Sequence, residues 1–124
     1  MPFEFPSGPW RGYWLYPGSA ARHKMRLDLK FAAARVMGDG DDEIGYFVIN
    51  GKYDAEGGTC AWTKTYPRSH QVFYTGARDA RGISGVWATH PGWSGGFAIW
   101  PGEHEEGFAD ETEEADSVTL LVPG

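Results

Sequence analysis

The sequence contains a single cysteine and no long hydrophobic run, and these two shortages exclude several classes of protein. Cys60 cannot form an internal disulfide framework, which fits a reducing compartment, so we expect a cytoplasmic location. No segment approaches the roughly 18–20 consecutive apolar residues of a transmembrane helix, and we expect no membrane partner. The opening MPFEFPSGPW also lacks the basic and apolar regions of a signal peptide.

No Lys or Arg occurs after Arg81, whereas residues 103–116 hold eight of the seventeen acidic residues. Nucleic-acid binding usually requires a pronounced basic surface, and this chain has one basic strip, at residues 22–30. We therefore expect no nucleic-acid partner. The length of 124 residues predicts a single domain, residues 1–124, in which the acidic segment 103–116 forms a surface loop.

Aromatic residues and glycine are abundant, with six Trp, six Tyr and seven Phe among eighteen Gly. The clearest strand covers residues 23–31, where apolar residues alternate with charged ones, as in a half-buried antiparallel strand. Turn signals, including the Gly/Asp cluster 38–42, separate further runs of this kind. These runs are 9–16, 44–50, 59–66, 70–77, 82–90, 95–101 and 117–123. Together they predict an all-β, single-domain, antiparallel up-and-down eight-stranded β-barrel.

The sequence indicates no catalytic residue, metal site or cofactor. Its histidines occur singly, without the spacing of a zinc site, and are His23, His70, His90 and His104. His23 shares the apolar face of its strand, so we interpret it as a core or rim histidine, and Cys60 as a small core residue. The acidic cluster 39–43 lacks the ligand order of an EF-hand and is typical of a turn. No helix is predicted after Ser84, as a nucleophile elbow would require, so we do not expect an enzyme.

The stretch WTKTYPRSHQVFYTG, residues 62–76, predicts a hairpin with a lysine among aromatic residues. Residues two apart on a strand share a face, so Trp62, Lys64 and Tyr66 lie together. If residues 67–69 form a three-residue turn, Lys64 faces Val72 and Trp62 faces Tyr74. A two-residue turn would shift the second strand by one residue and reverse its inward and outward side chains.

Lys64 is the anomaly of this hairpin, because an unpaired charge inside an apolar core is very costly. Its ammonium must reach a carboxylate, reach water at the barrel mouth, or bind an anionic ligand. We expect the second arrangement, in which the side chain extends along apolar surface to the rim. The candidate ligand-binding residues bordering this open end are Trp62, Lys64, Tyr66, Tyr74 and Trp87.

The central part of the chain resembles the avidin and streptavidin family over about half of its length. The matching positions are Gly51, Tyr53 and Asp54, then Trp62 and His70 across the hairpin, then Ile83 and Trp87. The resemblance implies an eight-stranded barrel of calycin type in which Trp62 and Trp87 line the cavity. Gly12 stands where the family has an Asn that helps to bind the biotin ureido oxygen, and Gln71 stands where it has a Ser, so these positions argue against biotin binding.

These features predict a non-enzymatic barrel that binds a small anionic or amphipathic ligand in its mouth. The alternative is a protein-interaction barrel with a filled interior, followed by a biotin-binding avidin-like protein or an uncharacterised enzyme. A large cavity lined by Trp62, Tyr74 and Trp87 would favour the first, and a filled interior with an exposed aromatic patch the second. The expected partners are therefore a small molecule or another protein, and an oligomer is compatible with the sequence.

Overall fold

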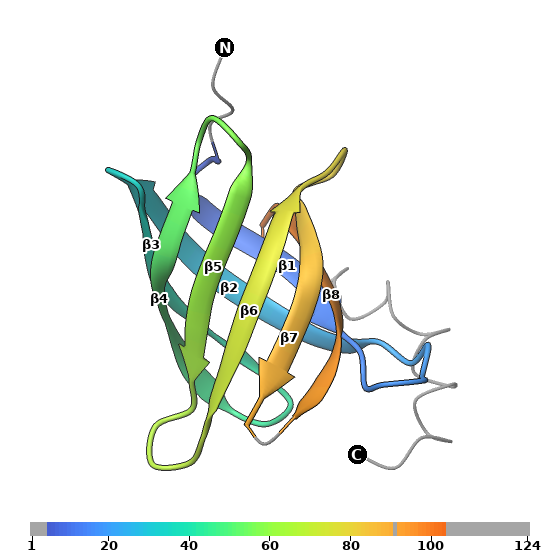
Figure 1. The fold of residues 1–124 in the computed structure, drawn as a ribbon. Coiled ribbons are helices and arrows are strands. Elements are labelled where there is room, and N and C mark those ends of the chain that lie inside the picture. The colour runs from blue at the N-terminus through green and yellow to red at the C-terminus, as the bar shows by residue number, and fades with distance from the viewer. Residues whose placement is uncertain (1–4, 91, 104–124) are drawn as a thin grey trace.

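The computed structural model describes residues 5–90 and 92–103, which form a closed antiparallel barrel (Figure 1). Eight strands pair in chain order, and β1 closes the barrel by pairing with β8. The strands are β1 (Gly8–Trp14), β2 (His23–Ala32), β3 (Arg35–Asp42), β4 (Tyr46–Asp54), β5 (Thr59–Thr65), β6 (Gln71–Arg78), β7 (Ile83–Thr89) and β8 (Trp93–Pro101). The predicted all-β, up-and-down eight-stranded barrel is confirmed. No helix that could span a membrane occurs within these two described ranges.

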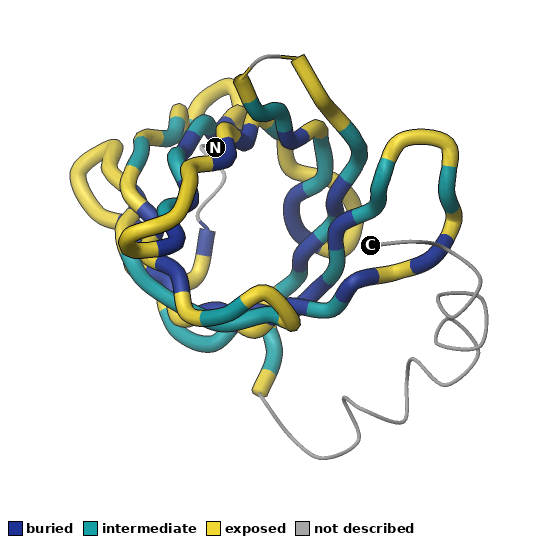
Figure 2. The backbone as a smooth tube through the Cα atoms, turned by 90° about the horizontal axis from the view of Figure 1, so that it is seen from below, coloured by how far each residue is buried: buried dark blue, intermediate teal, exposed yellow. Residues whose placement is uncertain are grey.

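The barrel interior is filled by the inward side chains of each strand. In β2, His23, Met25, Leu27, Leu29 and Phe31 are buried, whereas the intervening positions are exposed or half-buried. Viewed from below, the strands form a closed ring along which buried and more exposed residues alternate (Figure 2). This two-residue period follows from the pleat of a strand, so the predicted inward face of residues 23–31 is confirmed.

Strand β3 was missed by the sequence analysis, which assigned the cluster 38–42 to a turn. The turn instead consists of Ala33 and Ala34, whose φ angles are 52° and 66°. Residues 38–42 continue β3 and pair with β2 and β4. A Cβ atom added at Gly40 would lie 2.0 Å from the carbonyl oxygen of Arg26, so the strand approaches its neighbour too closely for a side chain there.

Two predicted segments lie outside the described residues. One is the run 117–123, which was expected as a strand. The described residues already contain eight strands, because β3 adds one that was not expected. The acidic loop 103–116 is described only at Glu103, so its assignment as a surface loop stays a prediction.

The hairpin of β5 and β6 has the register expected for the longer turn. Lys64 pairs with Val72, and Trp62 pairs with Tyr74. The backbone N–H of Tyr66 donates to the carbonyl oxygen of His70 at 2.9 Å, which fixes the turn. The side chains of Trp62, Lys64, Tyr66, Val72 and Tyr74 are therefore all buried.

The two ends of the barrel differ in how they are filled. At the end that is uppermost in Figure 1, Phe5 stacks on Phe31 at 5.2 Å and meets the Tyr53 ring edge-on at 5.8 Å. Trp10 also contacts Phe31, at 5.6 Å between ring centroids. We call this the closed end. The other end, where β5 and β6 are joined by residues 66–70, contains the cavity described next, and we call it the open end.

Candidate functional site

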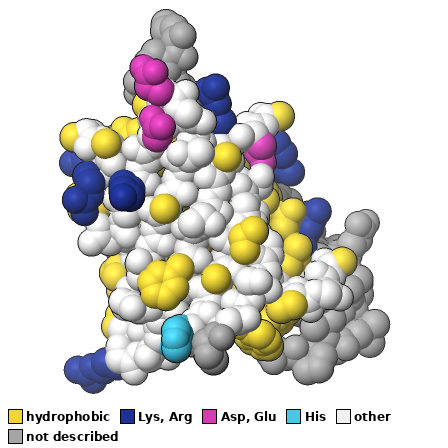
Figure 3. All heavy atoms as spheres, viewed as in Figure 1, with side chains coloured by type: hydrophobic (Ala, Val, Ile, Leu, Met, Phe, Trp, Pro, Cys, Tyr) yellow, Lys and Arg dark blue, Asp and Glu magenta, His cyan; other side chains and the backbone are white. Residues whose placement is uncertain are grey.

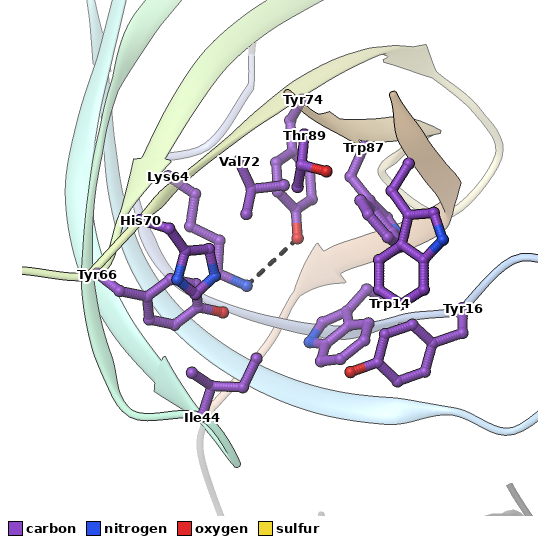
Figure 4. A pocket seen from close by; sticks show the side chains of 11 residues that line it. Trp14, Tyr16, Ile44, Lys64, Tyr66, His70, Val72, Tyr74, Trp87 and Thr89 are labelled. Atoms are coloured by element: carbon purple, nitrogen blue, oxygen red, sulfur yellow. Dashed lines mark hydrogen bonds between the residues drawn. The ribbon is translucent and has the colours of Figure 1, made fainter. Parts of the chain in front are cut away.

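A cavity of about 90 Å³ enters the barrel at the open end (Figure 4). Exposed residues surround its mouth, among them Ile44, His70 and Trp93, whereas Lys64 and Tyr74 are almost fully buried at its depth. The complete lining is Trp14, Tyr16, Ile44, Lys64, Tyr66, His70, Val72, Tyr74, Trp87, Thr89 and Trp93. The cavity therefore leads from the surface to a buried cation.

Lys64 forms a buried ion pair with Asp42. The ammonium Nζ lies 2.7 Å from Oδ2 of Asp42, and the two side chains are 2% and 0% exposed. The expectation that Lys64 extends to water at the rim is wrong, because its strand directs the side chain inward to this carboxylate. A partner in the core removes the cost that an unpaired buried charge would carry.

The turn after β3 holds the Asp42 carboxylate in place. Oδ1 accepts the backbone N–H groups of Ile44 at 2.9 Å and of Gly45 at 3.2 Å. Oδ2 accepts hydrogen bonds from Lys64 and from the Tyr66 hydroxyl, the latter at 2.5 Å. Asp42, the last residue of β3, thus stabilises the turn that follows the strand and also provides the charge partner that the sequence analysis did not identify.

Aromatic groups surround the Lys64 ammonium on its remaining sides. It donates to the Tyr74 hydroxyl at 3.2 Å, and its nitrogen lies 3.7 Å from the sulfur of Met25. The nitrogen is 4.3 Å from the centroid of the Phe47 ring and 5.2 Å from that of Tyr66. Such contacts stabilise a cation, and more strongly where water is excluded.

Burial changes the acid–base behaviour of this cluster. Desolvation lowers the pKa of Lys64 from 10.5 to about 8, and the charge and hydrogen bond of Asp42 oppose that change. Desolvation also raises the pKa of Tyr66 and of Tyr74 far above the usual tyrosine range, with the Asp42 charge adding to both effects. Both tyrosines are therefore neutral hydroxyls at neutral pH, whereas Lys64 titrates close to it.

A second polar pair lies beside the cavity. The Nδ1 atom of buried His23 is 3.0 Å from Oε2 of Glu43, and the His23 ring stacks on Trp14 at 4.3 Å. Among the described residues, no hydrogen-bond partner is found for Nε2 of His23 or for Nε1 of Trp14. By contrast, Nε1 of Trp87 donates to the carbonyl oxygen of Leu15 at 2.8 Å. Figure 4 shows the Trp14 nitrogen turned toward the same space as the Lys64 nitrogen and the Tyr74 oxygen.

Four of the five candidate ligand-binding residues lie together around this cavity, namely Lys64, Tyr66, Tyr74 and Trp87. Trp62 does not line it, because its ring stacks behind Tyr74 at 5.6 Å and packs against Phe97. Sequence reasoning missed Trp14, although its inward position in β1 follows from the two-residue period. That these residues bind a ligand stays a prediction.

Three other polar groups lie outside this cavity, namely Cys60, Asp41 and Asp39. Cys60 is buried, and desolvation raises the pKa of its thiol to about 12, as befits an inert core residue. Asp41 pairs with Arg26 on the outer surface, and Asp39 accepts a hydrogen bond from Tyr46. Within residues 5–90 and 92–103, no group of three His, Cys, Asp or Glu side chains could hold a metal ion.

Comparison of the chain with protein-family models, with curated proteins and with solved structures found no match. The fold class is therefore defined by the closed barrel, and the function must be argued from the open-end cavity.

Proposed function

We propose that this protein is a non-enzymatic binding barrel and that its open-end cavity binds the head of a small amphipathic molecule. The observation that carries the proposal is the passage from exposed aromatic and apolar residues at the mouth to buried polar groups at the depth. A cleft with apolar walls and a few convergent polar groups is the usual form of a small-molecule site.

The walls and the depth of the cavity are suited to different parts of one ligand. Trp87, Val72 and Trp93 offer apolar surface, while the Trp14 indole and the Tyr74 hydroxyl offer hydrogen bonds at the depth. A buried N–H group without a partner carries a desolvation cost, which a ligand acceptor atom would remove. The ligand that fits has a hydrogen-bond-accepting head and an apolar body.

An uncharged head suits the cavity better than an anion. The Asp42 carboxylate already neutralises Lys64 at 2.7 Å, so an anion entering the cavity would face a negative charge as well as a positive one. Of the two ligand classes expected from the sequence, the amphipathic one is therefore favoured.

The volume limits how much of the ligand enters. An apolar cavity of roughly 150 Å³ can hold benzene, whereas this cavity measures about 90 Å³. Only a head group of a few heavy atoms fits inside. The apolar body then lies across the mouth, against exposed Ile44 and Trp93.

Tryptophan fluorescence tests this proposal through acrylamide quenching with hexanamide, which has a neutral head, and with hexanoate, which has an anionic one. We expect hexanamide to protect the open-end indoles from acrylamide and hexanoate to protect them less. Trp14→Phe keeps a ring but loses the N–H, so it should weaken the protection. Trp10→Phe is the matched control, because Trp10 lies at the closed end and its N–H donates to the carbonyl oxygen of Pro6. No protection by either probe would refute the proposal.

Protein interaction is the second candidate function, favoured by apolar side chains on the outer surface. Phe73 is 45% exposed on β6 and Val86 is 48% exposed on the adjacent β7. Figure 3 shows separate apolar side chains among polar ones on this face. Under this alternative, a cytoplasmic protein partner or a second copy of the chain would cover Phe73. Replacing Phe73 with Ser should then reduce self-association or partner binding without changing the response to hexanamide.

A further inference from the structure

We propose that Lys64 captures small aldehydes or ketones as a reversible imine inside the open-end cavity. The inference rests on the proposed function, because it requires that the cavity admit a small amphipathic molecule. It goes further by naming the chemical class of the head group, a carbonyl carbon, and the atom that bonds to it, Nζ of Lys64.

The position of Lys64 provides the first argument. Its side chain is almost fully buried, yet it lines a cavity whose mouth is formed by exposed residues. A small carbonyl compound can therefore approach Nζ through the mouth while bulk water is largely excluded. Water exclusion matters because an imine is hydrolysed where water has open access.

The neighbours of Nζ provide the second argument. Asp42 lies at 2.7 Å and the Tyr74 hydroxyl at 3.2 Å, so a proton acceptor and a proton donor both adjoin the reacting nitrogen. Lysine amines that form imines with carbonyl substrates are activated when their surroundings favour the unprotonated form. Burial does this for Lys64, whose pKa falls to about 8.

The reaction balances with groups that are present. The unprotonated amine of Lys64 attacks the carbonyl carbon, a C–N bond forms, and the carbonyl oxygen becomes the hydroxyl of a carbinolamine. Asp42, 2.7 Å from the nitrogen, accepts the proton that the nitrogen loses and passes it to this oxygen. The nitrogen lone pair then expels the oxygen as water, while the Tyr74 hydroxyl donates a hydrogen bond to it. The net change is amine plus carbonyl compound to imine plus water, with no oxidant or reductant.

The test treats the full chain with propanal and sodium cyanoborohydride, which reduces an imine to a stable propyl amine. Peptide mass mapping then measures the modification of each lysine. Lys30 and Lys52 are internal controls, because both are exposed. At neutral pH, a lysine with a pKa of about 8 has roughly 300 times the amine fraction of one at 10.5. Because propanal reaches a buried amine more slowly than an exposed one, we expect a smaller ratio of rates, with Lys64 reacting at least about tenfold faster than either control.

The pH profile sharpens the test. Modification of Lys64 should reach half its maximal rate near pH 8 in the folded chain, whereas in the urea-unfolded chain its rate should still rise above this pH. The charged and titratable groups around Lys64 are Asp42, Glu43, His23, Tyr16, Tyr66, Tyr74 and His70. Tyr74→Phe should slow the modification of Lys64 without changing that of Lys30 or Lys52. Unfolding the protein in urea should abolish the selectivity for Lys64.

The outcomes separate this inference from the proposed function. If Lys64 reacts no faster than Lys30 and Lys52 although hexanamide protects the indoles, the imine is refuted and the binding function stands. If Lys64 reacts slowly and hexanamide gives no protection, both are refuted. Selective modification of Lys64 that disappears in urea supports the imine. Selectivity that persists in urea would refute it, because it would not depend on the cavity.

Discussion

The two ends of the barrel are filled by different kinds of side chain. At the closed end, Phe5, Trp10, Phe31 and Tyr53 pack ring against ring. At the open end, a cation, a carboxylate and two tyrosine hydroxyls occupy the corresponding space. Both ends bury their side chains, but only the open end buries polar groups whose burial is costly when any partner is lost.

This difference bears on what each end contributes to the stability of the barrel. Aromatic packing stabilises a fold directly, at about 25 cal/mol per Å² of apolar surface removed from water. A buried ion pair is weak evidence for stability, because well-packed apolar residues of similar volume often stabilise as much or more. Stability alone is therefore a weak explanation for the buried Lys64–Asp42 pair, which is why the proposed ligand binding is placed at the open end.

The largest effect is expected from breaking the open-end ion pair. Asp42→Asn keeps the shape of the side chain but leaves the Lys64 cation without its carboxylate. The free energy of unfolding should fall by about 3–5 kcal/mol, which urea denaturation would measure. The double variant Asp42→Asn with Lys64→Met removes the unpaired cation and should recover most of this loss. A loss below about 1 kcal/mol for the single variant would mean that the pair is not buried as described.

A smaller effect is expected at the closed end. Phe31→Leu removes part of a ring that packs against Phe5 and Trp10, and should cost about 1–2 kcal/mol in urea denaturation. The reaction of Lys64 with propanal and the protection by hexanamide should not change. A change in either would show that the two ends are coupled and would break the distinction drawn between them.

The sequence predicted the strands of the barrel better than the chemistry of its open end. The alternation of apolar and charged residues in 23–31 identified β2 and its inward face, because one face of that strand is apolar throughout. In β3, alternating glycine and aspartate carry no such signal, and the preceding turn is Ala33–Ala34, which has no turn residues. Sequence reasoning therefore placed a turn where a strand lies.

The same error concealed the partner of Lys64. The sequence analysis required a carboxylate, water or an anion for this cation, and the carboxylate proved to be Asp42. Asp42 lies at the end of the missed strand and is 22 positions from Lys64 in the chain. No local pattern connects the two, because their contact depends on the pairing of β3 with β4 and of β4 with β5. Long-range pairings of this kind follow from topology and not from spacing.

The free energy of unfolding should depend on pH through Lys64 at the open end, by about 1 kcal/mol between pH 8 and pH 9. Because the pKa of Lys64 falls from 10.5 to about 8 on folding, the unfolded chain binds more protons at this residue between these values. The contribution of Lys64 to the free energy of unfolding therefore rises with pH across that window. Cys60 acts in the opposite direction, since its pKa rises from 9.0 to about 12.

Comparison with Lys64→Met removes the contribution of Cys60, which both proteins share. The difference in free energy of unfolding between wild type and this variant should grow by about 1 kcal/mol from pH 8 to pH 9 in favour of wild type. Urea denaturation at both pH values measures it. A constant difference would indicate that Lys64 keeps an ordinary pKa in the folded chain.

The smallest effect is expected from Asp41, the neighbour of Asp42 that faces the opposite side of the sheet. Asp41 pairs with Arg26 at 3.2 Å, but these side chains are 50% and 48% exposed. Water and salt screen such a pair, so Asp41→Asn should cost less than about 0.5 kcal/mol, and less still in 1 M salt. The adjacent Asp42→Asn should keep its full effect in salt, because its partner is buried. Equal losses in the free energy of unfolding for the two variants would contradict the difference in burial between the two carboxylates. The comparison between the two ends of the barrel would then fail.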